Sequence, residues 1–376
     1  MSSKVTRYRA TVEDILQRCD IRLDGEREQD MIVHDEAMFG RVVHDGSLGF
    51  GEAYMDGQWD CLRVDCLIDN LLSHREGYKL HKGIKEVLFD LQSSYINCQT
   101  KIRSLIVGRQ HYDVGNDLYE AMLDPHMMYS CAYWNGQTNL NDAQECKLDM
   151  VCQKLELKPD MTLLDIGCGW GGMARFAAEK YGVTVVGVTI SREQQRFAQE
   201  RCAGYPVDIR FQDYRELEGE FDRIVSIGMF EHVGYKNYRT YFNKCHALLK
   251  DKGLFLLHTI GSNKTVTNGD AWLEKYIFPY GMLPSVKQMG DAAEPLWVLE
   301  DWHNFGSDYD RTLMAWHQNI SVRWQDLGDR YDQRFKRMWD YYLLSCAGVF
   351  RSRYSQLWQI VFSKGVRKQR YDRPCI

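Results

Sequence analysis

From residue 155 onward, short apolar runs alternate with amphipathic stretches whose apolar residues recur at helical spacing. Unbroken runs rich in β-branched residues, with helices between them, are typical of a parallel sheet covered on both faces. The pattern predicts strands at residues 162–166, 183–189, 207–211, 222–227 and 253–259. It also predicts helices at 173–181 and 192–202, the second capped by Ser191. This part of the chain is therefore expected to form a doubly wound α/β domain.

The first ninety or so residues have a different pattern, typical of short helices joined by glycine-containing turns. Apolar residues recur at helical spacing in residues 12–16, 38–44, 67–72 and 84–91. Four glycines fall within residues 46–57, which predicts turns with close backbone approach. Residues 93–99 are polar and aperiodic. We therefore expect a smaller, mainly helical domain at 1–93 and a larger domain at 94–376.

Composition excludes several classes of protein. With 376 residues, 44% of them hydrophobic and 26% charged, the chain is expected to be globular and not disordered. No apolar run approaches the roughly 20 residues that span a bilayer, and the amino terminus lacks the apolar core of a secretory signal. The sequence pI of about 6.1 argues against a dedicated nucleic-acid binder. A cytoplasmic protein with no nucleic-acid partner is expected.

Charge distribution and cysteine content bear on possible ligands. Residues 351–376 hold seven basic residues against one acid. Such a terminus is usually a solvated tail, but it would also suit anionic phospholipid head groups, near which each cation contributes about 1 kcal/mol. The twelve cysteines form no C-x-x-C pair, and no histidine pair completes a zinc site, so reduced thiols and no metal are expected.

Asp165 and a glycine-rich run, Gly167-Cys-Gly-Trp-Gly-Gly172, separate the first predicted strand from a helix. Glycines at such a junction let a ligand approach the backbone and the helix N–H groups. The run also matches the dinucleotide pattern G-x-G-x-x-G, but residues 186–190 lack the acid expected about twenty residues on. A tight turn without a ligand is a further alternative. With its strand-terminal acid, the block resembles the first motif of class I S-adenosylmethionine (SAM)-dependent methyltransferases, whose fold is Rossmann-like.

Six blocks in the chain closely resemble cyclopropane-fatty-acyl-phospholipid synthases and occur in one order. They lie at residues 111–119, 128–134, 187–195, 228–234, 255–261 and 301–309. The resemblance covers nearly the whole chain, including the Gly-rich amino-terminal module of the bacterial phospholipid-acting members. It implies transfer of the sulfonium methyl of SAM to a cis double bond in a phospholipid acyl chain, giving a cyclopropane ring.

The implied reaction has two physical needs. Attack by the alkene produces a carbocation-like species, which must be shielded from water, and a base must then remove a proton so that the ring can close. Aromatic faces stabilise a cation by about 0.5–2 kcal/mol each. Four aromatic residues lie near the blocks: Tyr133, Trp134, Tyr309 and Trp316. The resemblance implies a bound bicarbonate ion as the base, with contacts, some through backbone atoms, from Cys131, Glu231, His258, Ile260 and Tyr309.

The resemblance also implies the residues that contact the cofactor. They are Tyr129, Ser130, Asp165, Gly167, Cys168, Gly169, Gly171, Thr189, Gln194, Asp213 and Tyr214. Gln194 would replace the acid that grips the ribose hydroxyls in many class I methyltransferases, and Asp213 and Tyr214 would lie near the adenine. A cysteine regarded as an active-site residue in the family corresponds to Cys346, for which a packing role is at least as compatible with this chemistry.

A lipid substrate implies further partners, and two alternatives stay open. The expected location is cytoplasmic, with residues 1–93 in peripheral contact with the inner membrane surface, and the chain is expected to be a homodimer. The alternative enzyme is a small-molecule N-methyltransferase, because plant alkaloid N-methyltransferases share much of the pattern. A lipid-binding scaffold is the non-enzyme alternative. Taken singly, Glu231, His258 and Tyr309 would be a helix N-terminal charge, a core histidine and a packing aromatic.

Overall fold

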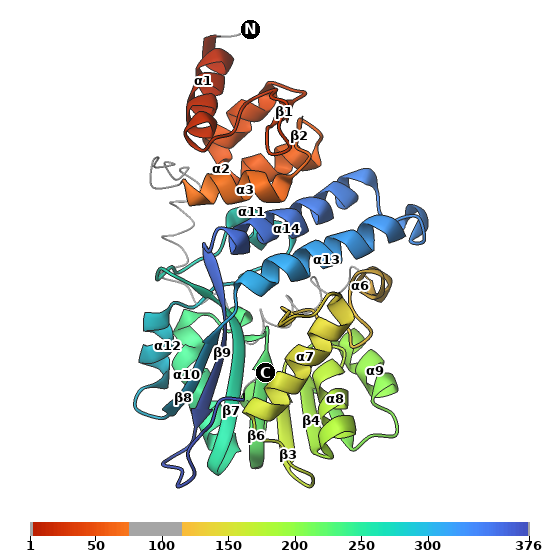
Figure 1. Cartoon of the computed structure of the whole chain (residues 1–376), viewed down its shortest axis with the longest axis vertical. Helices are drawn as coiled ribbons and strands as arrows, with labels where there is room; N and C mark the ends of the chain where they lie inside the picture. The colour runs from red at the N-terminus through yellow and green to blue at the C-terminus, as the bar shows by residue number, and fades with distance from the viewer. Residues whose placement is uncertain (1–2, 75–114, 375–376) are drawn as a thin grey trace. The chain divides into compact units, whose positions relative to one another are not determined.

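The computed structural model describes residues 3–74 and 115–374, and the chain divides into two compact units (Figure 1). The helical unit comprises the described residues of Met1–Asn97 together with Thr267–Gly281 and Leu313–Ser355. The α/β unit comprises the described residues of Cys98–Val266 with Met282–Thr312 and Gln356–Ile376. The predicted boundary near residue 93 and the predicted helix at 84–91 lie outside the described residues, and the division at 93 stays a prediction. The helical unit also contains Thr267–Gly281 and Leu313–Ser355, so the two units cannot be separated by one boundary in the sequence.

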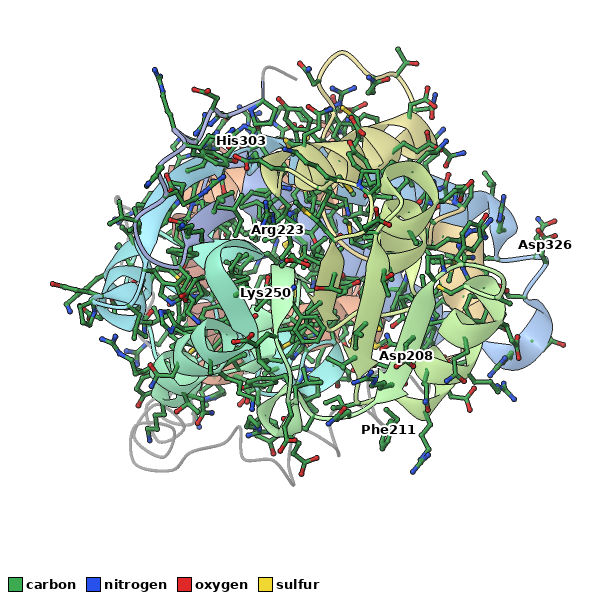
Figure 2. The ribbon with its side chains drawn as sticks, turned by 90° about the horizontal axis from the view of Figure 1, so that it is seen from below. Asp208, Phe211, Arg223, Lys250, His303 and Asp326 are labelled. Carbon is green, nitrogen blue, oxygen red and sulfur yellow. The ribbon has the colours of Figure 1, made fainter. Side chains whose placement is uncertain are left out.

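A seven-stranded sheet in the order β5-β4-β3-β6-β7-β9-β8 forms the α/β unit. Its strands are β3 (Thr162–Ile166), β4 (Thr184–Thr189), β5 (Val207–Phe211), β6 (Phe221–Ile227), β7 (Leu249–Ser262), β8 (Val298–Asn304) and β9 (Ser355–Ser363). The five strands from β5 to β7 are parallel neighbours, and β8 pairs antiparallel with β9. In Figure 2 the labelled residues Asp208 on β5, Arg223 on β6 and His303 on β8 mark the order of these strands across the sheet. The predicted doubly wound α/β fold and its five strands are confirmed, whereas β8 and β9 were not predicted.

Hydrophobic side chains alternate between the two faces of this sheet. Leu254 and Leu256 of β7 join a cluster with α7 (Leu140–Lys154), α8 (Gly172–Tyr181) and α9 (Arg192–Arg201). Their neighbours Phe255 and Leu257 join a second cluster with α10 (Tyr238–Leu248) and α12 (Val286–Ala293). Because successive strand residues point to opposite faces, α7 to α9 cover one face and α10 with α12 the other. Since helices cover both faces of the sheet, a ligand can reach it at the ends of its strands.

The helical unit gathers elements from both halves of the chain. They are α1 (Ser3–Arg18), α2 (Ala37–Met55), α3 (Val64–Ser73), α11 (Ala271–Tyr276), α14 (Gln333–Arg351), the carboxyl-terminal part of α13 (Ser307–Arg323) and the short strands β1 (Ile32–Val33) and β2 (Trp59–Asp60). The prediction of turns across residues 46–57 is largely wrong, because most of this run is helix and only Gly46, with φ 57°, kinks α2. Close approach is confirmed at Gly51, where a Cβ would lie 2.4 Å from Trp272 Cδ1.

Asp65 of α3 is a fully buried carboxylate held by two arginines. Its Oδ2 lies 2.7 Å from both Arg63 Nη2 and Arg351 Nη1. We expect Asp65→Asn to lower the free energy of unfolding by about 1–2 kcal/mol, less than the roughly 3–5 kcal/mol for breaking a buried pair, because both arginines can turn toward water. Urea unfolding measures this difference. An equal loss in Asp69→Asn, a half-buried position on the same helix, would contradict the special role of the buried carboxylate.

Candidate active site

Several predicted site residues lie at the carboxyl ends of neighbouring parallel strands. Asp165 is the penultimate residue of β3, and Thr189 is the last residue of β4. Glu231 follows β6 in a short 3-10 helix, and His258 of β7 pairs in register with the last residue of β6. Carboxyl ends of parallel strands share one edge of the sheet, and open α/β sheets bind their ligands there. The fold therefore brings these four residues to one edge.

The glycine-rich run forms the loop between β3 and α8. Gly167, Gly169 and Gly171 have φ angles of 83°, 53° and 81°, a region that favours glycine. The N–H groups of Gly167 and Cys168 both donate to the Val188 carbonyl of β4, at 2.9 and 3.0 Å, which holds the loop on the sheet. A Cβ built on Gly169 would meet no described atom within 4 Å. One side of the loop is therefore open to a ligand.

Asp165 places a buried carboxyl group at the base of this loop. Its side chain is 2% exposed, and Oδ2 has no hydrogen-bond partner among the described residues. Burial raises the pKa of Asp165 to about 7, and the nearby ammonium of Lys147 opposes this shift. A buried acceptor is costly unless a donor meets it. The site thus fits SAM, whose amino-acid portion brings an ammonium group.

Gln194 is held in one orientation at the start of α9. Thr189 Oγ1 donates to Gln194 Oε1 at 2.9 Å and accepts from the Ser191 N–H at 3.2 Å. Ser191 caps α9, as predicted, by accepting from the Gln194 N–H at 3.3 Å. Because Oε1 is engaged, Nε2 is the end of the side chain that can donate to a ribose oxygen.

Replacing Gln194 with leucine is expected to weaken SAM binding by about 5–10-fold, because one hydrogen bond contributes about 1 kcal/mol. Isothermal titration calorimetry on the full chain measures the change. Gln199→Leu is the matched control, since the Gln199 amide donates to the Ile209 carbonyl at 3.0 Å and serves α9 packing. If the control weakens SAM binding as much as Gln194→Leu does, the ribose assignment is wrong.

Asp213 and Tyr214 follow β5, the strand beside β4. Both carboxylate oxygens of Asp213 accept from the Arg215 guanidinium, at 2.9 and 2.7 Å. The Tyr214 ring packs edge-on at 5.2 Å from Tyr241 of α10. Their strand-end position agrees with a place beside the cofactor, and their contact with the adenine stays a prediction.

The segment of Tyr129 and Ser130 is tied to the glycine-rich loop and to α7. The Tyr129 ring lies 5.2 Å from that of Tyr119, which lies 4.8 Å from that of Trp170 in the loop. Ser130 Oγ accepts from Nζ of Lys147 at 2.9 Å. Lys147 is wholly buried, and burial lowers its pKa to about 8. Nothing in the sequence separated Lys147 from a solvent-exposed helix lysine, so it was not predicted.

The five residues predicted to hold the base are joined by contacts. The Ile260 N–H donates to Glu231 Oε1 at 2.7 Å. The Phe305 ring lies 5.8 Å from the His258 ring. Phe305 also belongs to the hydrophobic cluster that includes Cys131, Ile260 and Tyr309. The residues chosen from separate blocks therefore form one site.

Glu231 and His258 are both buried, and burial shifts the pKa of each. Burial raises the pKa of Glu231 to about 7 and lowers the pKa of His258 well below its ordinary value, so His258 is neutral at pH 7. Gln359 Nε2 lies 3.3 Å from His258 Nδ1, and since an amide nitrogen only donates, the ring proton is on Nε2. Neither Glu231 Oε2 nor His258 Nε2 has a hydrogen-bond partner among residues 3–74 and 115–374. An N–H donor beside a carboxyl group is suited to a small oxyanion.

The two cysteines predicted to lie in the catalytic part of the site, Cys131 and Cys346, are both neutral thiols. Burial raises the pKa of Cys131 well above its ordinary value, and its Sγ lies 4.0 Å from Thr312 Oγ1. Thr312, which was not predicted, also accepts from the Trp134 indole at 2.9 Å and so holds the segment that carries Cys131. Cys346 is on α14 of the helical unit, where burial raises the pKa of its thiol to about 12. Cys346 takes no part in the contacts that join the five residues predicted to hold the base.

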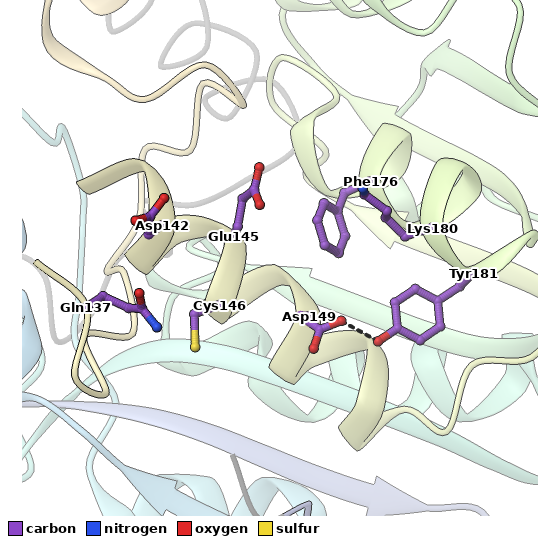
Figure 3. A pocket seen from close by; sticks show the side chains of 8 residues that line it. All are labelled: Gln137, Asp142, Glu145, Cys146, Asp149, Phe176, Lys180 and Tyr181. Atoms are coloured by element: carbon purple, nitrogen blue, oxygen red, sulfur yellow. Dashed lines mark hydrogen bonds between the residues drawn. The ribbon is translucent and has the colours of Figure 1, made fainter. Parts of the chain in front are cut away.

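A hollow of about 600 Å³ lies between α7 and α8 (Figure 3). Its lining is Gln137, Asp142, Glu145, Cys146, Asp149, Phe176, Lys180 and Tyr181. Figure 3 shows Asp149 directed at Tyr181, whose hydroxyl donates to it at 2.5 Å. None of the predicted site residues lines this hollow, so we do not assign it to the reaction.

The chain is similar to known proteins in both sequence and structure. The sequence profile of the mycolic acid cyclopropane synthetase family matches residues 99–360. Cyclopropane-fatty-acyl-phospholipid synthase from Escherichia coli K12 is 54% identical over 353 residues, which cover 94% of this chain and 92% of that protein. The structure of mycolic acid cyclopropane synthase CmaA1 with SAH and CTAB is similar at a TM-score of 0.63 and 31% identity, covering 69% of this chain and 98% of that one. Coclaurine N-methyltransferase, at a TM-score of 0.66 and 20% identity over 84% of this chain and 98% of its own, shares the fold alone. The resemblance to cyclopropane-fatty-acyl-phospholipid synthases that the sequence blocks predicted is thus confirmed, and the chain belongs to the mycolic acid cyclopropane synthetase family.

Proposed function

We propose that this protein uses SAM to convert cis double bonds in the acyl chains of membrane phospholipids into cyclopropane rings. One observation carries the proposal. A loop that fits SAM lies at the same sheet edge as a buried carboxyl group, Glu231, and a buried imidazole, His258. Glu231 Oε2 and His258 Nε2 have no hydrogen-bond partner among the described residues. The 54% identity to the Escherichia coli enzyme supports the phospholipid substrate. The reaction balances as methyl transfer to the alkene, loss of one proton and closure of the ring.

The chain's own residues meet the first need of this reaction, which is to bind and shield. Bound SAM supplies an electrophilic methyl group on a sulfonium sulfur. Asp165 would hold its amino-acid portion by an ionic hydrogen bond, and Gln194 would hold its ribose by an amide donor. The rings of Tyr133 and Tyr309 pack on the cluster around Phe305, which excludes water and offers aromatic faces to a carbocation.

The second need is a base, for which we propose bicarbonate. His258 Nε2–H is oriented to donate to an anion, and the Glu231 carboxyl, with its pKa raised to about 7, can take or release a proton near neutral pH. Cys131, Tyr309 and the backbone at Ile260 complete the set. For Cys346 we propose a packing role, because a neutral thiol has no step in this chemistry.

We further propose that residues 1–93 make peripheral contact with the inner membrane surface, that the rest of the protein remains in the cytoplasm, and that the chain acts as a homodimer. In the part of the chain that the structure describes, no helix has both the length and the apolar character to cross a bilayer. Co-sedimentation of the full chain with phospholipid vesicles tests the contact. If a variant that lacks residues 1–93 binds vesicles as well as the full chain, this assignment is wrong.

The function is tested by incubating the protein with SAM and vesicles of a monounsaturated phospholipid, followed by mass analysis of the released acyl chains. The expected product has gained one CH2 unit and lost its double bond. Vesicles of the saturated phospholipid are the control and should give no product. Methylation of soluble amines without any change in the acyl chains would instead support the N-methyltransferase alternative and refute the proposal.

A further inference from the structure

The segment after β9 is bound to the α/β unit through its basic residues. Lys364 Nζ donates to the Leu249 carbonyl at 2.7 Å, and Arg367 pairs with Glu156 at 2.5 Å. Tyr371 packs on the hydrophobic cluster of the α7–α9 face. Through these contacts Lys364, Arg367 and Tyr371 are held on the unit and do not form a freely solvated tail. The segment is a structural part of the unit.

Arg373 reaches a buried carboxylate at the edge strand β8. Its Nε donates to Asp301 Oδ1 at 2.6 Å, and Lys154 Nζ lies 3.2 Å from Asp301 Oδ2. The side chains of Lys154 and Asp301 are 1% and 3% exposed, whereas that of Arg373 is 50% exposed. Asp301 is therefore compensated from two sides, and Arg373 is the partner that reaches it from the surface.

Lys154, which pairs with Asp301, also forms a hydrogen bond with His303. Its Nζ lies 3.1 Å from His303 Nδ1. Burial, together with the charges of Lys154 and Arg373, lowers the pKa of His303 to about 4, so the neutral ring accepts this hydrogen bond. Asp301 and His303 are two residues apart in β8 and so project to the same face. The Asp301–Lys154 pair thus fixes the rotation of the His303 ring.

The His303 ring contacts the wall of the proposed reaction site. Its centroid lies 5.6 Å from that of Tyr133 and 5.0 Å from that of Phe305. Tyr133 and Phe305 meet edge-on at 5.3 Å, and Phe305 lies 5.8 Å from His258. The ammonium of Lys154 also contributes to the lowered pKa of His258. A continuous chain of side-chain contacts therefore connects Arg373 to His258.

We propose that Arg373 is a positioning residue for the reaction, which through Asp301, Lys154 and His303 fixes the rings of Tyr133 and Phe305 beside His258. This inference rests on the proposed function. The effect of Arg373 is separate from cofactor binding, because the SAM loop follows β3 and Gln194 lies after β4, and β6, β7 and β9 stand between these strands and β8 in the sheet. Displaced rings would slow the step at the acyl chain and leave SAM affinity unchanged.

The test compares three full-length variants with the wild type on vesicles of a monounsaturated phospholipid: Arg373→Ala, Arg373→Lys and Arg370→Ala. Arg370 is the matched control, since it is 87% exposed and pairs with the neighbouring Asp372. We expect Arg373→Ala to lower kcat about tenfold, because small misplacements of reacting groups cost up to about 10²-fold. KM for SAM and vesicle binding should be unchanged. Arg373→Lys should recover most of kcat, and Arg370→Ala should match the wild type.

Three outcomes would overturn the positioning role. One is an unchanged kcat in Arg373→Ala. Another is a fall in kcat accompanied by equal losses of SAM affinity and thermal stability, which would mean general unfolding. The third is a loss of vesicle binding that accounts for the loss of rate, which would place Arg373 at the membrane. A wild-type protein that gives no cyclopropane product refutes the proposed function and this role together, whereas a wild type with product isolates the failure to Arg373.

Discussion

Replacing Glu231 with glutamine is expected to lower turnover by about 10²–10⁴-fold while SAM affinity stays nearly unchanged. Glutamine keeps the size of the side chain and can still accept from the Ile260 N–H, but it cannot carry charge or exchange a proton with a bound base. The cofactor is expected to be held mainly by Asp165 and Gln194, so its binding should persist. Single-turnover rates on unsaturated phospholipid vesicles and calorimetric titration with SAM measure the two quantities separately.

The control for this substitution is Glu179→Gln on α8, which makes the same chemical change at a surface ion pair with Arg175. It should leave both the rate and the affinity at wild-type values. Wild-type turnover in Glu231→Gln would exclude Glu231 from the proton step. A loss of SAM affinity as large as the loss of rate would instead assign Glu231 to the cofactor site.

The same substitution should stabilise the ligand-free protein at higher pH. Burial raises the pKa of Glu231 from 4.5 to about 7, so between these values the folded chain binds more protons than the unfolded chain. The free energy of unfolding therefore falls as pH rises through this window, by about 3 kcal/mol in all at 1.36 kcal/mol per pKa unit. Glutamine does not titrate. Urea unfolding should find Glu231→Gln more stable than the wild type above pH 7, and a pH-independent difference would contradict a buried, ionisable Glu231.

The sequence predicted the five parallel strands of the sheet and missed the antiparallel pair formed by β8 and β9. The strands β3, β4, β6 and β7 each contain consecutive apolar residues, and β5 alternates apolar with charged residues, so all five could be found from their pattern. In β9 every residue is buried, but Gln356 and Gln359 interrupt the apolar pattern. In β8 the buried residue is Asp301, whose charge is compensated by Lys154 and Arg373. Because Lys154 and Arg373 are far from Asp301 in the sequence, the local residue pattern of β8 does not show that its carboxylate is compensated.

The same distinction applies to the candidate site. Asp165 could be named because it lies near the end of a strand before a glycine-rich run, whereas Glu231 was named from the resemblance of its block to the family, with which its place just after a strand agrees. The residues that support them could not. Lys147, Lys154 and Gln359 belong to types that are usually exposed, and their burial follows from Ser130, Asp301 and His258, which reach them only in the folded chain.

Replacing Asp165 with asparagine is expected to weaken SAM binding by about 10–100-fold, because a hydrogen bond to a charged group contributes about 1.5–3 kcal/mol. Asparagine has the same shape but no charge to attract the ammonium group of SAM. Turnover at saturating SAM should fall far less than in Glu231→Gln, since Asp165 does not take part in the proton step. Calorimetric titration measures the affinity, and Asp208→Asn, an exposed position on β5 (Figure 2), should leave it unchanged.

The pH dependence of binding distinguishes a direct contact from a general disturbance of the loop. With its pKa raised to about 7 in the ligand-free protein, Asp165 must release its proton before it can pair with an ammonium group. The wild type should therefore lose SAM affinity as pH falls below about 7, approaching tenfold per pH unit. Asp165→Asn has no such proton to release, so its weaker binding should vary little over the same range. Parallel pH profiles in the two proteins would show that another group controls the affinity and would remove Asp165 from the cofactor contact.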